Sequence, residues 1–202
     1  MAIRKVAAMG NPILYKIAKP VADPTDPEVA RLAADMQDTL IDIGGSGLAA
    51  PQVFESLRLV VYRFSARLDD NVEELAEPWV TLVNPVLTPV GDEMISGWER
   101  CLSIPGLHGK VPRYKSLSMT YQDLSGAEVT VEASGALAAL LQHECDHLDG
   151  VLYPMQMPDI SKLEFNAEPG HLAQDIADGA KVWPVLRDLV DAWPGRELWF
   201  EG

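Results

Sequence analysis

The chain has 202 residues and a formal net charge of −14, from 16 Lys and Arg against 30 Asp and Glu. This length fits one domain, and a hydrophobic content of 48% excludes global disorder because such a chain can bury enough apolar surface to fold. The acidic excess argues against nucleic-acid binding and against docking on anionic lipid, which both need clustered Lys and Arg.

The start of the chain carries no pattern typical of export. Gly10, Asn11 and Pro12 interrupt it before an apolar run of signal-peptide length forms, and no Arg- and Ser-rich transit segment is present. No run of about 18 apolar residues occurs, so we expect no membrane span and a cytoplasmic location. The two cysteines, Cys101 and Cys145, are then expected to stay reduced.

The first clear element is a helix that begins at Pro27. Asp26 is a good N-cap, proline suits the first helical position, and apolar residues recur at helical spacing until Gly44 and Gly45 stop the helix. A β-branched and aromatic run at Leu57–Phe64 then predicts a strand.

Two further segments precede the middle of the chain. Residues 67–77 are polar and acidic, which predicts a surface loop. Trp79–Val90 is a second strand region, and its Pro85 and Pro89 indicate a sheet edge or a β-bulge.

A hairpin and a central helix follow. Leu117–Tyr121 and Glu128–Val131 alternate apolar and polar residues around a turn at 123–126. Ser134 is a good N-cap for a helix to about Leu148, whose apolar first half suggests a central position. Beyond Tyr153, prolines divide the chain into short pieces. The predicted fold is therefore α+β, with mixed or antiparallel strands around the central helix.

This helix carries the strongest chemical pattern, His143-Glu144-Cys145-Asp146-His147. Two imidazoles four residues apart lie on one helical face and can share a metal ion. Glu144 lies about 100° further round and can reach a water on that metal. The alternative interpretation is a solvated helix end with two unrelated histidines.

Two other segments add context. Gly45–Gln52 combines small residues with a terminal amide, and no lysine follows its glycines as a phosphate loop would require. Glu99–Pro105 contains Cys101, a thiol that is either a third metal ligand or a small buried residue. Taken singly, the first segment is only a helix stop followed by a tight turn.

In this order, the three segments resemble the three signature motifs of the peptide deformylase family, over residues 1–155. Gly45–Gln52 and Gln142–His147 match fully, and Glu99–Ser103 matches except at Arg100, where the family usually has glycine. The resemblance implies one catalytic domain, 1–155. Residues 156–202 form an acidic C-terminal extension that packs on this domain or trails from it.

The resemblance also implies a reaction, the removal of the formyl group from N-formylmethionine of newly synthesised proteins, with release of formate. Metal-bound water is the nucleophile and Glu144 the general base and acid. Cys101, His143 and His147 are the implied ligands of one divalent metal, ferrous iron in vivo, with zinc, nickel or cobalt also able to occupy the site.

Further roles come from motif position. Gln52 and the backbone N–H of Leu102 are the implied donors to the oxyanion, and Gly47 hydrogen-bonds the substrate backbone. The methionine side chain is expected to enter an apolar pocket, for which Ala136, Ala139 and Leu140 are candidates or else plain core.

Some nearby residues have open interpretations. Cys145 faces away from the metal side of its helix and is read as core. Asp146 and Glu99 are either partners that orient the ligands or members of structural salt bridges. His108 and His171 show no partner pattern.

Arg100 is the departure from the family motif. If its backbone is extended, the substitution costs nothing and the side chain can pair with an acid such as Glu99. If positive φ were required, Cys101 would be displaced and activity lowered. We expect an active enzyme.

Two other functions compete with this interpretation. A zinc peptidase of the His-Glu-x-x-His type would need a third ligand downstream, for which Glu164, Glu168 and His171 are candidates. It leaves Gln52 and Cys101 unexplained. A non-catalytic metal-binding protein that kept the fold is supported only by Arg100 and the acidic tail.

The charge of the tail bears on partners. Residues 155–202 carry four basic and nine acidic side chains, a net charge of −5. Some deformylases end in a basic helix thought to touch ribosomal RNA, and phosphate would repel this acidic segment. Any ribosome contact is therefore expected to be weak or to use another surface, and the oligomeric state is not predicted.

Overall fold

A computed structural model describes residues 2–64 and 78–195 of the chain. Its helices are α1 (Pro27–Ile43), α2 (Gly135–Leu148), α3 (Gly170–Ala177) and α4 (Pro184–Asp191), with short 3-10 turns η1 (Pro12–Tyr15), η2 (Ala50–Val53), η3 (Tyr153–Gln156) and η4 (Ile160–Lys162). The predicted loop at 67–77 lies outside the described residues. No helix in the described ranges is long and apolar enough to cross a membrane.

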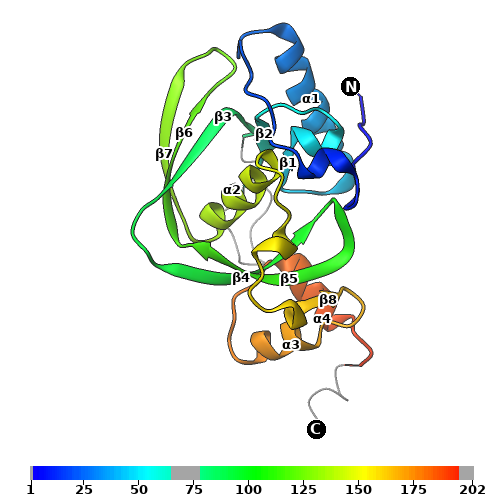
Figure 1. The fold of residues 1–202 in the computed structure, drawn as a ribbon. Coiled ribbons are helices and arrows are strands. Elements are labelled where there is room, and N and C mark those ends of the chain that lie inside the picture. Colours follow the sequence, from blue (N-terminus) through cyan, green and yellow to red (C-terminus); the bar gives the residue numbers. More distant parts are fainter. Residues whose placement is uncertain (1, 65–77, 196–202) are drawn as a thin grey trace.

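The strands form two antiparallel sheets (Figure 1). The five-stranded sheet has the order β1-β2-β3-β6-β7, from β1 (Gly47–Ala49), β2 (Leu59–Tyr62), β3 (Val80–Pro89), β6 (Ser116–Gln122) and β7 (Glu128–Ser134). The three-stranded sheet has the order β4-β5-β8, from β4 (Met94–Cys101), β5 (Ile104–Tyr114) and β8 (Leu163–Phe165). The predicted α+β fold with antiparallel strands around a central helix is confirmed.

Helix α1 begins and ends as its sequence predicts. The Asp26 side chain accepts a hydrogen bond from the backbone N–H of Glu28, which satisfies one of the free donors of the first turn. At the other end, Gly44 has a φ of 74° and donates its N–H to Leu40.

The prolines of β3 mark a bulge rather than a sheet edge. The strand lies between β2 and β6, and its register shifts between Val83 and Val86. Asn84 takes a φ of 52° in this irregularity, and its side chain bonds the backbone of Val21. The bulge accommodates Pro85, and Pro89 is the last residue of the strand, so both prolines fit within the sheet.

Helix α2 lies between the two sheets in Figure 1, where it buries one side against the five-stranded sheet. Ala138, Leu141, Cys145 and Leu148 pack into that core, so the core prediction for Cys145 is confirmed. The expected N-cap at Ser134 is wrong in one respect: its side chain makes no capping hydrogen bond, and β7 runs directly into the helix at Gly135.

β8, α3 and α4, within residues 163–195, build a small module against the outer face of the three-stranded sheet. β8 pairs with β5, and α3 and α4 form an apolar cluster with Trp98 of β4. The Asp175 carboxylate accepts the indole N–H of Trp98 at 2.7 Å and pairs with Lys110 at 2.6 Å. The module is therefore attached to the strand that ends at Cys101.

Candidate metal centre

The central feature of the site is a cluster of Cys101, His143 and His147. One ligand atom from each residue lies within 4.8 Å of the others, and all three residues are buried. The Cys101 Sγ lies 3.3 Å from Nε2 of His147. The two imidazole rings, one helical turn apart on α2, have centroids 5.2 Å apart.

The ligands come from two secondary-structure elements, β4 and α2, that are far apart in the sequence. His143 and His147 lie on one face of α2 because their spacing is one helical turn. Cys101 is the last residue of β4, an edge strand of the three-stranded sheet. The fold thus places the end of a strand against a helical face, as a three-ligand site requires.

The donor set fits a divalent metal of the iron, nickel or zinc kind. A thiolate and two imidazoles suit these metals, and three protein ligands leave a coordination position open for water. Burial lowers the pKa of His147 well below its ordinary value, which keeps it neutral as a ligand must be. Burial would also lower the pKa of His143, but Cys101 and Glu99 raise it well above its ordinary value. These two acidic groups thus favour a cation at the cluster.

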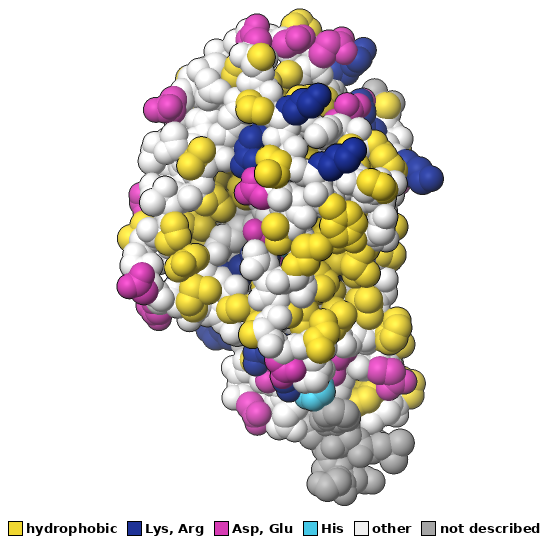
Figure 2. All heavy atoms as spheres, in the orientation of Figure 1, with side chains coloured by type: hydrophobic (Ala, Val, Ile, Leu, Met, Phe, Trp, Pro, Cys, Tyr) yellow, Lys and Arg dark blue, Asp and Glu magenta, His cyan; other side chains and the backbone are white. Residues whose placement is uncertain are grey.

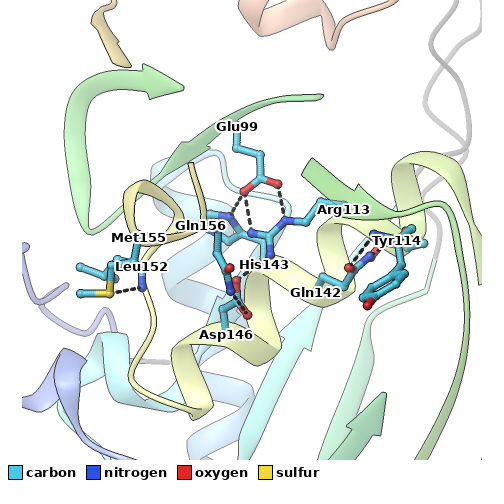
Figure 3. A network of polar contacts seen from close by, with 10 residues as sticks. Glu99, Arg113, Tyr114, Gln142, His143, Asp146, Leu152, Met155 and Gln156 are labelled. Carbon is cyan, nitrogen blue, oxygen red and sulfur yellow. Dashed lines mark hydrogen bonds and ion pairs between the residues drawn. The ribbon is translucent and has the colours of Figure 1, made fainter. Parts of the chain in front are cut away.

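Glu99 fixes the orientation of His143 (Figure 3). Its Oε2 lies 2.7 Å from Nδ1 of His143. Arg113 of β5 holds the same carboxylate through two hydrogen bonds, at 2.7 and 3.0 Å, and reaches Asp146 at 2.6 Å. Burial would raise the pKa of Glu99, but the bonds from His143 and Arg113 lower it to about 2. Glu99 therefore both orients a ligand and joins a salt bridge. Asp146 contacts Arg113 and Gln156, so it is a member of the salt bridge.

Sequence reasoning missed Arg113. The residue is 4% exposed and ties β5 to β4 and to α2. A buried arginine is recognisable only from its partners, because the same residue type is usually exposed in a strand. The local signal, an isolated arginine in Val111–Tyr114, does not distinguish the two cases.

Glu144 lies beside the ligands and against the glycine segment. Its side chain is buried, and its Oε2 has no hydrogen-bond partner among the residues that the structure describes. Burial raises the pKa of its carboxyl to about 7. Its Oε1 would lie 2.3 Å from a Cβ at Gly47, so only glycine fits there.

Gln52 directs an amide N–H toward the thiol. Its Oε1 accepts the backbone N–H of Ala49 at 2.8 Å, which sets the amide orientation. Nε2 then lies 3.6 Å from the Cys101 Sγ and 3.2 Å from Ser103 Oγ. Leu102, next to Cys101 in the chain, is half-buried against the Gly45 side of the glycine segment.

The pocket candidates Ala136, Ala139 and Leu140 are all half-buried on α2. Leu140 packs against the core cluster that contains Ala138 and Leu141, which favours the plain-core alternative for this residue. The partial exposure of Ala136 and Ala139 leaves their side chains accessible to a ligand.

The backbone of Arg100 is extended, because the residue lies in β4. Its φ is not positive: among the described non-glycine residues, Phe54 and Asn84 have positive φ. The conformational alternative that displaces Cys101 is therefore excluded. The suggested pairing with Glu99 is wrong, since Glu99 points to the opposite face of β4 and bonds Arg113 and His143.

Of the two remaining histidines, His171 lies in the C-terminal module and His108 lies in β5, facing that module. His108 is fully buried and contacts Glu164 and Asn166, and His171 bonds the same Glu164. Glu164 is thus engaged outside the metal cluster, whose third ligand residue is Cys101. Glu168 accepts a hydrogen bond from the Trp193 indole, so none of the three downstream candidates of the zinc-peptidase alternative belongs to the described cluster.

A separate cleft of about 430 Å³ lies on another side of α2, visible in Figure 2 as a hollow beside the helix. Gln142, Cys145 and Asp146 line it from the helix, and Arg113 lines it from β5. It contains none of the three ligand residues. The ion pairs of Arg113 therefore lie between this cleft and the metal cluster.

Comparison with known proteins agrees with this geometry. Residues 3–163 match the family model described as polypeptide deformylase. The chain is 43% identical over 180 residues to "Peptide deformylase 1" of Nitrosomonas europaea, covering 87% of this chain and 99% of that protein. It is 44% identical over 163 residues to "Peptide deformylase 2" of Ralstonia nicotianae, covering 81% and 92%.

Solved structures give the same result. The class I type b peptide deformylase of Acinetobacter baumannii superposes with a TM-score of 0.70 at 32% identity, over 78% of this chain and 100% of that one. The peptide deformylase of Thermotoga maritima superposes with a TM-score of 0.69 at 31% identity, over 79% and 100%.

Proposed function

This chain belongs to the polypeptide deformylase family and has peptide deformylase activity, and we propose how its residues remove the formyl group from N-formylmethionine. The observation that supports the assignment of roles is the buried cluster of Cys101, His143 and His147 with Glu144 beside it. The substrates are N-formylmethionyl nascent peptides, and the products are formate and a free amino terminus.

Cys101, His143 and His147 hold one divalent metal ion, ferrous iron in vivo, and zinc, nickel or cobalt can replace it. When bound, such an ion lowers the pKa of a water and polarises the formyl carbonyl. Glu99 and Arg113 keep His143 in one orientation, so that Nδ1 stays protonated and Nε2 is free to coordinate.

Glu144 moves the proton. Its buried carboxyl group takes a proton from the attacking water and gives it to the departing amine nitrogen. Burial raises its pKa to about 7, so that both protonation states are accessible near neutral pH. Gly47 permits this placement because any side chain there would meet the carboxylate.

Gln52 and Leu102 stabilise the oxyanion that forms at the formyl oxygen. The Gln52 amide is fixed before the reaction by its bond from Ala49, so its Nε2–H needs no reorganisation. The backbone N–H of Leu102 is the second donor. Ala136 and Ala139 receive the methionine side chain.

The two sheets present free edges to the substrate. β1 is the edge strand of one sheet and β4 of the other, and Gly47 and Cys101 belong to them. An extended peptide can add to such an edge by main-chain hydrogen bonds. Gly47 hydrogen-bonds the substrate backbone in this arrangement.

The remaining assignments concern organisation and partners. Residues 1–155 form the catalytic domain, and 156–202 an acidic extension whose described part, up to residue 195, packs on it. We place the enzyme in the cytoplasm, and its ribosome contact is weak or uses a surface outside this extension because phosphate repels acidic groups. Tight, salt-sensitive ribosome binding through residues after Met155 would contradict that last assignment.

One assay tests the function. Protein prepared with ferrous iron and without oxygen should release formate from N-formylmethionyl peptides. Cleavage of an unblocked peptide in its place would favour a peptidase. Neither activity, with metal bound, would favour a non-catalytic metal-binding protein.

A further inference from the structure

Arg100 places a positive charge one residue before a metal ligand, at the position where the family motif usually has glycine. It lies in β4, an edge strand, and its side chain is exposed. The backbone is extended, so the side chain is not needed to support a special conformation. A conformational role therefore does not account for the arginine.

The guanidinium of Arg100 makes no hydrogen bond or ion pair with residues 2–64 and 78–195, although its charge acts on the Tyr153 hydroxyl group. The cations nearby in β5 are engaged: Arg113 pairs with Glu99 and Asp146, and Lys110 pairs with Asp175. Toward the described part of the chain, Arg100 thus keeps its hydrogen-bonding capacity.

The alternation of β4 determines where this side chain points. Glu99 and Cys101 face the metal cluster, and Trp98 faces the C-terminal module. Arg100 therefore shares the outer face with Trp98, beyond the part that the module buries.

The same alternation applies to a peptide added to the free edge of β4. If the methionine side chain points inward to α2, the side chain of the next residue points to the outer face. That second residue is then the neighbour of Arg100 across the strands, the closest side-chain relationship in a sheet.

We infer that Arg100 is a specificity-determining residue that favours formylated peptides with an acidic side chain directly after the methionine. The inference rests on the proposed function. An opposite-charge pair across two strands changes relative rates by about two- to fivefold. The acidic surface of the protein does not cancel this local preference, because charges beyond about 8–10 Å are screened at physiological salt.

The test compares three substrates, N-formyl-Met-Xaa-Ser amides in which Xaa is Glu, Gln or Lys. The amide removes the terminal carboxylate, which would otherwise supply its own anion. Formate release should give kcat/KM values in the order Glu, Gln, Lys, with Glu over Gln by about two- to fivefold, and high salt should reduce the ratio.

Variants then assign the preference to one side chain. Arg100→Gln should bring the Glu-to-Gln ratio to about one, Arg100→Lys should keep part of it, and Arg100→Glu should reverse the order. Arg187→Gln, an exposed position on α4, makes the same change in net charge and should leave the ratio as in the wild type.

The outcomes separate the two proposals. Absence of formate from all three peptides contradicts the proposed function. Formate release with equal rates, or with a preference that persists in Arg100→Gln, contradicts only the role of Arg100. If Arg100→Gln weakens binding to ribosomal RNA and leaves the peptide preference unchanged, the guanidinium contacts phosphate and the inference is wrong.

Discussion

Nδ1 of His143 lies 2.7 Å from Oε2 of Glu99, and an ionised carboxylate in this position can only accept the hydrogen bond. Nδ1 must therefore carry the proton, which leaves Nε2 with its lone pair for a metal. Arg113 keeps Glu99 ionised from the other side. Three residues from β4, β5 and α2 thus set the tautomer of one ligand.

Replacement of Arg113 by methionine should weaken both the fold and the metal site. It leaves Glu99 and Asp146 without their buried cation, a change that costs about 3–5 kcal/mol in comparable buried pairs. Loss of such an outer partner also lowers metal affinity by about 10–100-fold. Urea unfolding and competitive metal titration measure the two effects.

Arg31→Met is the matched control for this change. Arg31 is exposed and pairs with Glu28 within α1, so its loss should alter stability by about 0.5 kcal/mol or less. Equal destabilisation by both variants would show that Arg113 has no special structural role.

Gly47→Ala should disable the enzyme while metal stays bound. The new Cβ would lie 2.3 Å from Oε1 and 2.6 Å from Cδ of Glu144, so the carboxylate must move. A displacement of about 1 Å costs on the order of 100-fold in rate. Formate release and metal content measured on the same sample separate a displaced base from a lost metal.

Gly97→Ala supplies the comparison for folding. A Cβ at Gly97 meets nothing within 4 Å, so its thermal midpoint should stay close to that of the wild type. Wild-type rates in Gly47→Ala would mean that Glu144 does not occupy the described position.

The C-terminal module should loosen in acid because of Glu164. Burial would raise the pKa of this carboxyl, but hydrogen bonds from His108, His171 and Leu172 lower it. Because the pKa of Glu164 is lower in the folded than in the unfolded chain, its carboxylate stabilises the fold fully above about pH 4.5. This contribution to the free energy of unfolding is lost as the pH falls through the pKa of the folded state. Thermal unfolding followed by tryptophan fluorescence should report the loss, since Trp98 and Trp193 lie in the module's cluster.

Glu164→Gln isolates this contribution. The variant should be less stable than the wild type at pH 7, and the difference should shrink below pH 4. Glu128→Gln, an exposed strand position, should follow the wild-type profile. A constant difference between Glu164→Gln and wild type across this range would exclude the carboxylate charge as the cause.

The sequence predicts the elements whose signals are local. Asp26 and Gly44 bound α1 because capping depends on neighbouring residues, and the hairpin turn at Asp123 is visible in four residues. The metal ligands on α2 follow from helical spacing alone, and Cys101 joins them only through the family motif.

Long-range relationships are absent from such patterns. No prediction covered the β4–β5 hairpin, because Gly97, Gly106 and Gly109 weaken the local sequence signal for a strand. Hydrogen bonding between the two strands stabilises the hairpin, and a local sequence pattern does not show it. The role of Arg113 depends on partners 14 and 33 residues away, and the module depends on Trp98, 77 residues from Asp175. Such contacts follow from the topology and not from local propensity.

Glu144→Ala should abolish turnover and leave the metal in place. Glu144 is not a ligand, so Cys101, His143 and His147 keep their positions, whereas proton transfer loses the group that contributes about 10²–10⁴-fold. Formate release and metal content are the two measurements. Asp149→Asn, at an exposed carboxylate that ends the same helix, controls for a change of charge and should keep wild-type rates. Turnover at wild-type rate by Glu144→Ala would refute its role as the base, because no other described carboxylate lies free beside the ligands.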